Sequence, residues 1–122
     1  MSFEIYVNKI ETGKDVFLIS NIPMHDIDKI FYLKSFRNVT HLIFKNIEEE
    51  TLKENLFIGF DNLEILNLTC NKNISFEDEC FKSLKHLKSL DLSFCKILIL
   101  KENLFIGLDN LEILNLSFNE ET

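Results

Sequence analysis

The chain contains one long segment twice. Leu52–Leu68 and Leu100–Leu116 differ at a single position, where the first copy has Phe60 and the second has Leu108. Half of the offset between the two copies is the underlying period. The motif L-x-x-L-x-L begins at Leu63, Leu87 and Leu111, which gives a 24-residue period. A fixed period of this length predicts a solenoid, in which each repeat packs against the next.

One period earlier, Val39 begins the related segment VTHLIF. Counted from these opening residues, apolar side chains recur at positions one, four, six, fourteen, nineteen and twenty-two. Because side chains alternate along a strand, positions four and six point to the same side, toward the interior of a coil. The other positions close that interior, and each buried Leu or Phe contributes about 2 kcal/mol. Positions fourteen, nineteen and twenty-two are Leu52, Phe57 and Phe60, then Phe76, Phe81 and Leu84, then Leu100, Phe105 and Leu108.

This pattern resembles the leucine-rich repeat in its 24-residue form, from about residue 37 to 119 and more loosely over 13–36. The resemblance implies an α/β solenoid, a right-handed horseshoe with a parallel sheet on its concave side. Short helices, 3₁₀ turns or loops would form the convex side. We expect one domain, 1–122, with full repeats at 37–62, 63–86 and 87–110 and a partial repeat at 111–122. Two departures are Glu49 and Asn73, which stand at position eleven where an aliphatic residue is usual.

Residues 1–36 fit the repeat poorly. The alternating segments 3–7 and 16–20 predict two strands, with a turn at 12–15. Val16, Leu18 and Asn21 have the spacing of positions four, six and nine, which indicates a degenerate first repeat that reaches the next register slightly late. Residues 26–36 have partly helical spacing and predict a short helix or 3₁₀ turn.

Position nine calls for a polar side chain, because the chain turns there and leaves backbone groups outside the sheet. An amide both donates and accepts hydrogen bonds, so stacked Asn side chains can satisfy those groups from coil to coil. The column comprises Ile47, Asn71, Cys95 and Asn119. We interpret Cys95 as a small buried member of this column. The alternative, a disulfide from Cys70 to Cys95 between adjacent coils, requires a Cβ separation of about 4 Å.

Motifs and composition favour binding over catalysis. The sequence has no phosphate-binding loop, no G-x-S-x-G, no H-E-x-x-H and no C-x-x-C. We therefore expect no enzyme activity, no cofactor and no metal site. The net charge of −7 argues against a nucleic-acid partner. The longest aliphatic run, 97–100, is far below the roughly 20 residues that span a bilayer.

The concave face is predicted from positions two, three, five, seven and eight. It presents a mixture of polar and apolar side chains, and such a mixture with aromatic anchors is typical of protein interfaces. Our hypothesis is a face that binds a protein partner, centred on Phe94, Asn67, Asp91, Ile65 and Lys88. The alternative is that these are simply tolerated exposed side chains. The candidate binding residues are His41, Ile65, Asn67, Lys88, Asp91, Phe94, Glu112, Asn115 and Phe118.

Two settings for the repeats remain open. The segment 105–119 is similar to repeats of extracellular recognition proteins, including Toll-like receptor ectodomains, which implies a secreted or membrane-anchored parent. The sequons at Asn38 and Asn73 would then be glycosylation sites. An intracellular scaffold or regulator is the alternative, favoured by the unpaired cysteines and the lack of a signal peptide; a structural fragment with no function of its own is a third. We expect the last repeat to lack a cap, which predicts a longer array or end-to-end association.

Overall fold

The computed structural model describes residues 4–9, 15–20, 38–45, 47, 50–72, 74–97 and 99–119, and for 4–9, 15–20 and 50 it describes the backbone alone. The expected helix or 3₁₀ turn at 26–36 and the sequon residue Asn73 lie outside these ranges. The described residues form two sheets joined by turns, and no helix occurs among them.

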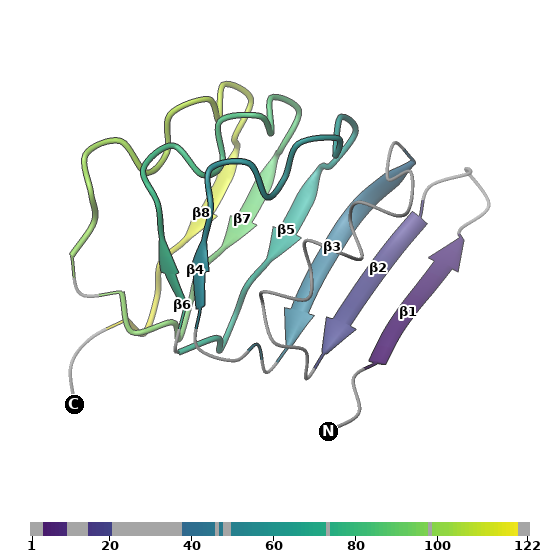
Figure 1. Ribbon diagram of the computed structural model, residues 1–122, viewed down its shortest axis with the longest axis horizontal. Helices are drawn as coiled ribbons and strands as arrows, with labels where there is room; N and C mark the ends of the chain where they lie inside the picture. Colours follow the sequence, from purple (N-terminus) through teal and green to yellow (C-terminus); the bar gives the residue numbers. More distant parts are fainter. Residues whose placement is uncertain are drawn as a thin grey trace.

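The main sheet has six strands in the order β1-β2-β3-β5-β7-β8 (Figure 1). Every neighbouring pair is parallel except β1 and β2, which are antiparallel. From β3 onward each strand pairs with the equivalent strand of the next repeat, as when Leu42 lies opposite Leu66 and Leu66 opposite Leu90. The strands are β1 (Glu4–Lys9), β2 (Asp15–Ser20), β3 (Val39–Lys45), β5 (Ile65–Asn67), β7 (Ser89–Asp91) and β8 (Ile113–Asn115).

The register of β2 corrects the predicted first repeat. Phe17 and Ile19, not Val16 and Leu18, lie opposite Leu42 and Phe44 in β3. An irregularity between Asp15 and Val16 shifts the pairing at this point. The residues of β2 that pair with Leu42 and Phe44 are therefore one position later in the chain than the spacing predicted.

A second, two-stranded sheet was not predicted. β4 (Glu50–Leu52) pairs in parallel with β6 (Ile74–Phe76), again at an offset of one repeat. The chain therefore passes alternately through the two sheets: β3, β4, β5, β6, then β7 (Figure 1). Ile74, next to Asn73, is buried and supplies the apolar contact that position eleven lacks.

The core lies inside the coils. Leu42, Leu66 and Leu90 at position four are buried, as are the residues at positions one and six of the same three repeats. Position nineteen was predicted to form a core column of Phe57, Phe81 and Phe105. Phe57 and Phe81 are buried, with stacked rings whose centroids are 5.9 Å apart, and Phe105 is partly buried against the same core. The buried apolar residues of all the described repeats form one continuous cluster, so the coils share a single core.

Interior positions at the C-terminal end of the described array are partly exposed, as expected for a last repeat without a cap. Leu100 at position fourteen is 47% exposed, and Leu114 at position four is 39% exposed. Their counterparts Leu52 and Leu66 are fully buried, although the surrounding sequence is nearly identical. The two copies differ in their neighbours. Among the described residues, a following coil packs against the first copy, and no following coil packs against the second.

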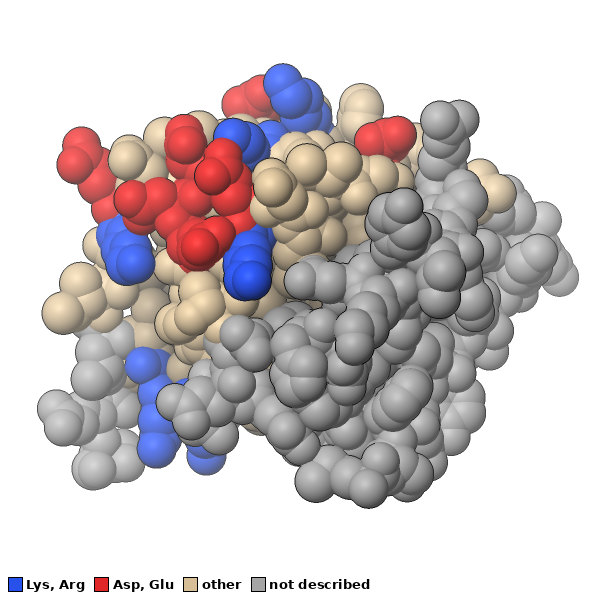
Figure 2. All heavy atoms as spheres, in the orientation of Figure 1, with Lys and Arg blue, Asp and Glu red and all other residues tan. Residues whose placement is uncertain are grey.

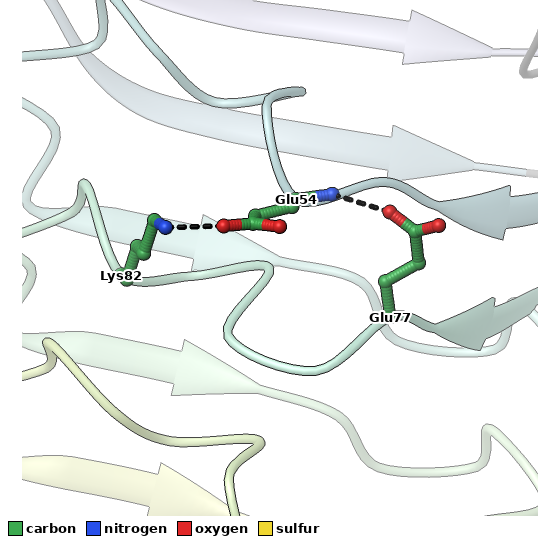
Figure 3. A network of polar contacts seen from close by, with 3 residues as sticks. All are labelled: Glu54, Glu77 and Lys82. Carbon is green, nitrogen blue, oxygen red and sulfur yellow. Dashed lines mark hydrogen bonds and ion pairs between the residues drawn. The ribbon is translucent and has the colours of Figure 1, made fainter.

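Acidic side chains gather on the face that carries the loops after β4 and β6, around a few lysines (Figure 2). In this region Lys82 forms an ion pair with Glu54, and the carboxylate raises the pKa of the lysine ammonium. The backbone N–H of Glu54 donates to Glu77 Oε1 at 2.8 Å (Figure 3). Such exposed pairs contribute little to stability, so this network mainly fixes the path of adjacent loops.

Candidate protein-binding face

Two rows of side chains cross the middle of the main sheet, on the face opposite the core. They come from positions three and five of β3, β5, β7 and β8, whose core positions alternate with them. Most are half-buried, and Ile113 in β8 is exposed. The rows are His41, Ile65, Ser89 and Ile113, then Ile43, Asn67, Asp91 and Asn115.

Three of the predicted binding residues also hold the turns that follow their strands. Asn67 Oδ1 accepts from the backbone N–H of Thr69 at 2.9 Å, and Asn115 Oδ1 accepts from that of Ser117 at 3.0 Å. Asp91 Oδ1 does the same for Ser93, from its N–H at 2.9 Å and its hydroxyl at 2.6 Å. These are Asx-type turns, a structural role that was not predicted although the Asx-x-Ser/Thr spacing in these three repeats signals it.

The Asp91 carboxylate is held in its charged form. Partial burial raises its pKa, but the hydrogen bonds from Ser93 and Thr69 outweigh this effect and leave the pKa below its ordinary value. Asp91 is therefore a fixed negative charge on an otherwise uncharged row.

Phe94 and Phe118 lie beyond the carboxyl ends of β7 and β8. Both have positive φ, 56° and 59°, as does Cys70 at the same position one repeat earlier, at 66°. This left-handed turn directs the side chains away from the core. The two rings stack at a centroid distance of 4.5 Å and an interplanar angle of 10°, and they are 41% and 69% exposed. The pair thus forms an exposed aromatic surface at the carboxyl ends of β7 and β8.

A polar groove of about 560 Å³ runs along the amino-terminal ends of the same strands. Position two contributes Thr40, Glu64, Lys88 and Glu112, of which Lys88 and Glu112 are predicted binding residues. Lys88 Nζ lies 3.4 Å from Glu64 Oε1. The other residues that line this groove were not predicted, although they recur once per repeat just before each opening residue. These residues are Asn38, Asn62, His86 and Asn110.

Asn71, Cys95 and Asn119 form one column beneath the turns. Asn71 Oδ1 accepts from the N–H of Ile47 at 3.0 Å, and its Nδ2 donates to Phe44 O and Leu68 O. Asn119 repeats this pattern one unit beyond Cys95, accepting from the Cys95 N–H at 2.8 Å and donating to Leu92 O at 2.9 Å. At position 95 the thiol donates in place of an amide Nδ2, and Cys95 Sγ lies 3.0 Å from Leu68 O.

All three cysteines are free thiols, and the alternative of a Cys70–Cys95 disulfide is not formed. Cys70 is exposed, whereas Cys80 and Cys95 are buried. Burial raises the pKa of Cys80 to about 12. It also raises the pKa of Cys95, although the backbone amides of Asn71 and Cys70 counteract the effect in part. The buried thiols are therefore protonated and poorly nucleophilic at neutral pH.

Within the described ranges, no three His, Cys, Asp or Glu side chains are grouped so that they could hold a metal ion. The same part of the chain contains no helix long and apolar enough to cross a bilayer. Asn38, one of the two predicted glycosylation sites, is exposed and lines the polar groove.

Parallel strands stacked at a fixed offset of one repeat, with a buried amide column beside them, define a repeat solenoid. Residues 61–120 match the family model described as leucine rich repeat, so the chain belongs to the leucine-rich repeat family. Domains of this family are generally protein–protein interaction modules and are typically not catalytic. No curated protein matches the chain.

Proposed function

We propose that the concave face of the main sheet binds a protein partner. The observation that carries this proposal is the stacked, exposed pair Phe94–Phe118 at one end of the strands. Aromatic side chains that are already ordered lose little entropy on binding and are frequent hot spots. The polar groove at the other end of the strands supplies a polar rim, so the face has an anchor and a specificity element.

The groove suits an extended segment of the partner. Neighbouring strands lie about 4.8 Å apart, so four coils span about 14 Å, which is the length of roughly four extended residues. Position two contributes two carboxylates, Glu64 and Glu112, and one ammonium, Lys88. This excess of negative charge favours a partner segment with basic side chains.

The test is site-specific photocrosslinking followed by affinity measurement. A benzoylphenylalanine at position 94 should capture a partner in cells, whereas the same group at position 58 should not. Ile58 is the matched control, because it is exposed and apolar but lies in the turn after β4. With the captured partner purified, Phe94→Ala should weaken binding by about 2 kcal/mol, and Ile58→Ala should leave it unchanged.

Asp91 needs a conservative change, because alanine would also break its turn. Asn occupies the same position in the neighbouring repeats, so Asp91→Asn keeps the acceptor and removes the charge. We expect weaker binding with unchanged thermal unfolding. Full affinity in both Phe94→Ala and Asp91→Asn, with folding intact, would refute the proposed face.

We propose further that the repeats belong to a secreted or receptor protein, with an intracellular scaffold as the alternative. The test is the mass of the chain from a secretory host before and after glycan removal. A shift that Asn38→Gln abolishes supports the secreted form, and a glycan there would cover the polar groove. Secretion without a shift, or retention with all thiols free, favours the intracellular scaffold.

We also propose that the uncovered side of the last coil mediates self-association. The supporting observation is that Leu100 and Leu114 are exposed, whereas their counterparts Leu52 and Leu66 are buried in an almost identical sequence.

A further inference from the structure

The two-stranded sheet ends one coil earlier than the repeat predicts. Thr51 lies opposite Ser75, and Leu52 opposite Phe76, at an offset of one repeat. The same offset would place Ile99 and Leu100 beside Ser75 and Phe76, yet neither belongs to a strand. β6 is therefore an edge strand within the described part of the chain.

Equivalent backbone carbonyls at the ends of β4 and β6 accept hydrogen bonds from different donors. Leu52 O accepts the backbone N–H of Glu77 at 2.9 Å, which continues the pairing of β4 with the next coil. Phe76 O is its equivalent one repeat later. It accepts instead from the side-chain ammonium of Lys101, at 3.3 Å. A flexible lysine thus occupies an acceptor that a backbone donor fills in the preceding coil.

A groove of about 190 Å³ follows this edge. Ile74, Phe76, Ile97 and Leu104 provide apolar walls, and Ile99, which is 83% exposed, lies at the rim. The charged residues that line it are Lys96 and Lys101, with no carboxylate among the described lining residues. The volume is below the roughly 300 Å³ of small-molecule pockets, so the groove suits a side chain of a peptide that runs along the edge.

We propose that the free edge of β6 binds an extended acidic peptide segment of another protein by β-strand addition. A backbone N–H of the segment would replace Lys101 Nζ at Phe76 O, because main-chain pairing is what an open edge offers. An apolar side chain would enter the groove and cover Ile99. Lys96 and the displaced Lys101 would pair with carboxylates of the segment, although the chain as a whole carries a net charge of −7. This site belongs to the second sheet and is separate from the proposed concave face.

The probe is a fluorescein-labelled hexapeptide of alternating glutamate and valine, acetylated and amidated, with binding followed by fluorescence anisotropy. Two controls isolate the two interactions: a lysine–valine hexapeptide reverses the charge, and N-methylation of alternate amides removes backbone donors. We expect the unmodified probe to bind the whole chain and each control to bind at least ten-fold more weakly. Hydrogen exchange at residues 74–76 should slow when the probe binds.

A charge swap tests the assignment to the lysines, both of which are exposed, so their substitution should leave the fold intact. The double variant Lys96→Glu and Lys101→Glu should lose the glutamate–valine peptide and gain the lysine–valine peptide. Phe94→Ala should leave probe binding unchanged, so failure of the concave-face proposal is separable from failure of this one.

Four results would overturn the inference. The first three are no binding up to the solubility limit of the probe, equal binding of the N-methylated peptide, and a charge swap that does not change the preference. The fourth is protection of residues 74–76 in the free protein that the probe does not alter. That outcome would mean that the chain's own segment closes the edge as a third strand.

Discussion

In the column of Asn71, Cys95 and Asn119, one side chain can satisfy backbone groups of two coils, so a single substitution there should strongly affect stability. Asn71 is almost fully buried and satisfies groups from two coils, the N–H of Ile47 and the carbonyls of Phe44 and Leu68. Asn71→Ala leaves these groups without partners, so we expect the free energy of unfolding to fall by about 3 kcal/mol. Urea denaturation followed by circular dichroism measures it. The control is Asn119→Ala, which should cost less because Asn119 is only partly buried; equal losses would contradict the reasoning.

Cys95 occupies the same column with a weaker side chain. Its thiol donates to Leu68 O, but sulfur is a poorer acceptor than an amide oxygen. The N–H of Asn71 has no side-chain oxygen to bond at position 95, and its backbone acceptor Leu68 O lies at a long 3.4 Å. We therefore expect Cys95→Asn to raise the free energy of unfolding by about 1 kcal/mol. An unchanged or lower value in the same denaturation experiment would show that the site has no room for the amide.

The thiols should respond differently to pH. The pKa of Cys80 is about 12 in the folded state, against an ordinary value of 9.0, so folding favours the protonated thiol. Its contribution to stability is complete below pH 9 and is lost as the pH rises toward 12. Denaturation at pH 8 and pH 10.5 should show this loss in the wild type, and the loss should be smaller in Cys80→Ala.

Ellman's reagent at pH 8 should modify Cys70 rapidly and the two buried thiols only after unfolding.

At the scale of elements, the repeated segment offers a matched pair of glycines. Gly59 and Gly107 have φ of 100° and 94°, a region that L-residues enter at a cost of about 1 kcal/mol. A Cβ on Gly107 would lie 2.4 Å from the Cα and O of Lys82, whereas one on Gly59 meets no described atom within 4 Å. We expect Gly107→Ala to lower the free energy of unfolding by roughly twice as much as Gly59→Ala, or more. Equal losses would mean that the coils separate easily at this contact.

The sequence predicted those elements whose side chains repeat strictly. Leu42, Leu66 and Leu90 share one period, and the strands that carry them pair at that period. The second sheet was not predicted, because position eleven, just before each of its strands, holds the polar residues Glu49 and Asn73 where an aliphatic residue is usual. The first repeat was placed one residue out of register, because a shift at Asp15 and Val16 leaves no mark in a pattern of alternating apolar residues.

The candidate site was predictable only in part, for a related reason. Periodicity identifies which side chains face away from the core, so the concave rows and Phe94 followed from it. It does not show which of these side chains are already used within the fold, as Asp91 is. The stacking of Phe94 on Phe118 also depends on left-handed turns, which non-glycine residues adopt rarely and a pattern of Leu positions cannot show.

At the scale of the whole molecule, the near-identical segments act as an internal comparison. Leu66 is buried because the coil that carries Leu90 covers it, and Leu114, its equivalent, is 39% exposed. The backbone shows the same difference, since Leu68 and Leu92 donate their N–H groups to Asp91 O and Asn115 O of the next coil. The Leu116 N–H has no such carbonyl among the described residues. Among the described residues the last coil thus presents both apolar side chains and a strand edge, and the proposed self-association rests on these two features.

We therefore expect the average mass of this chain, measured by light scattering after size exclusion, to rise with concentration. Leu114→Lys places a charge on the uncovered side and should shift the population toward monomer. Ile58→Lys is the matched control, because Ile58 is an exposed apolar residue in the turn after β4, and it should leave association unchanged. Circular dichroism must show that both variants fold. A constant monomer mass up to the solubility limit would refute self-association. Equal association in both variants would place the self-associating surface elsewhere on the molecule.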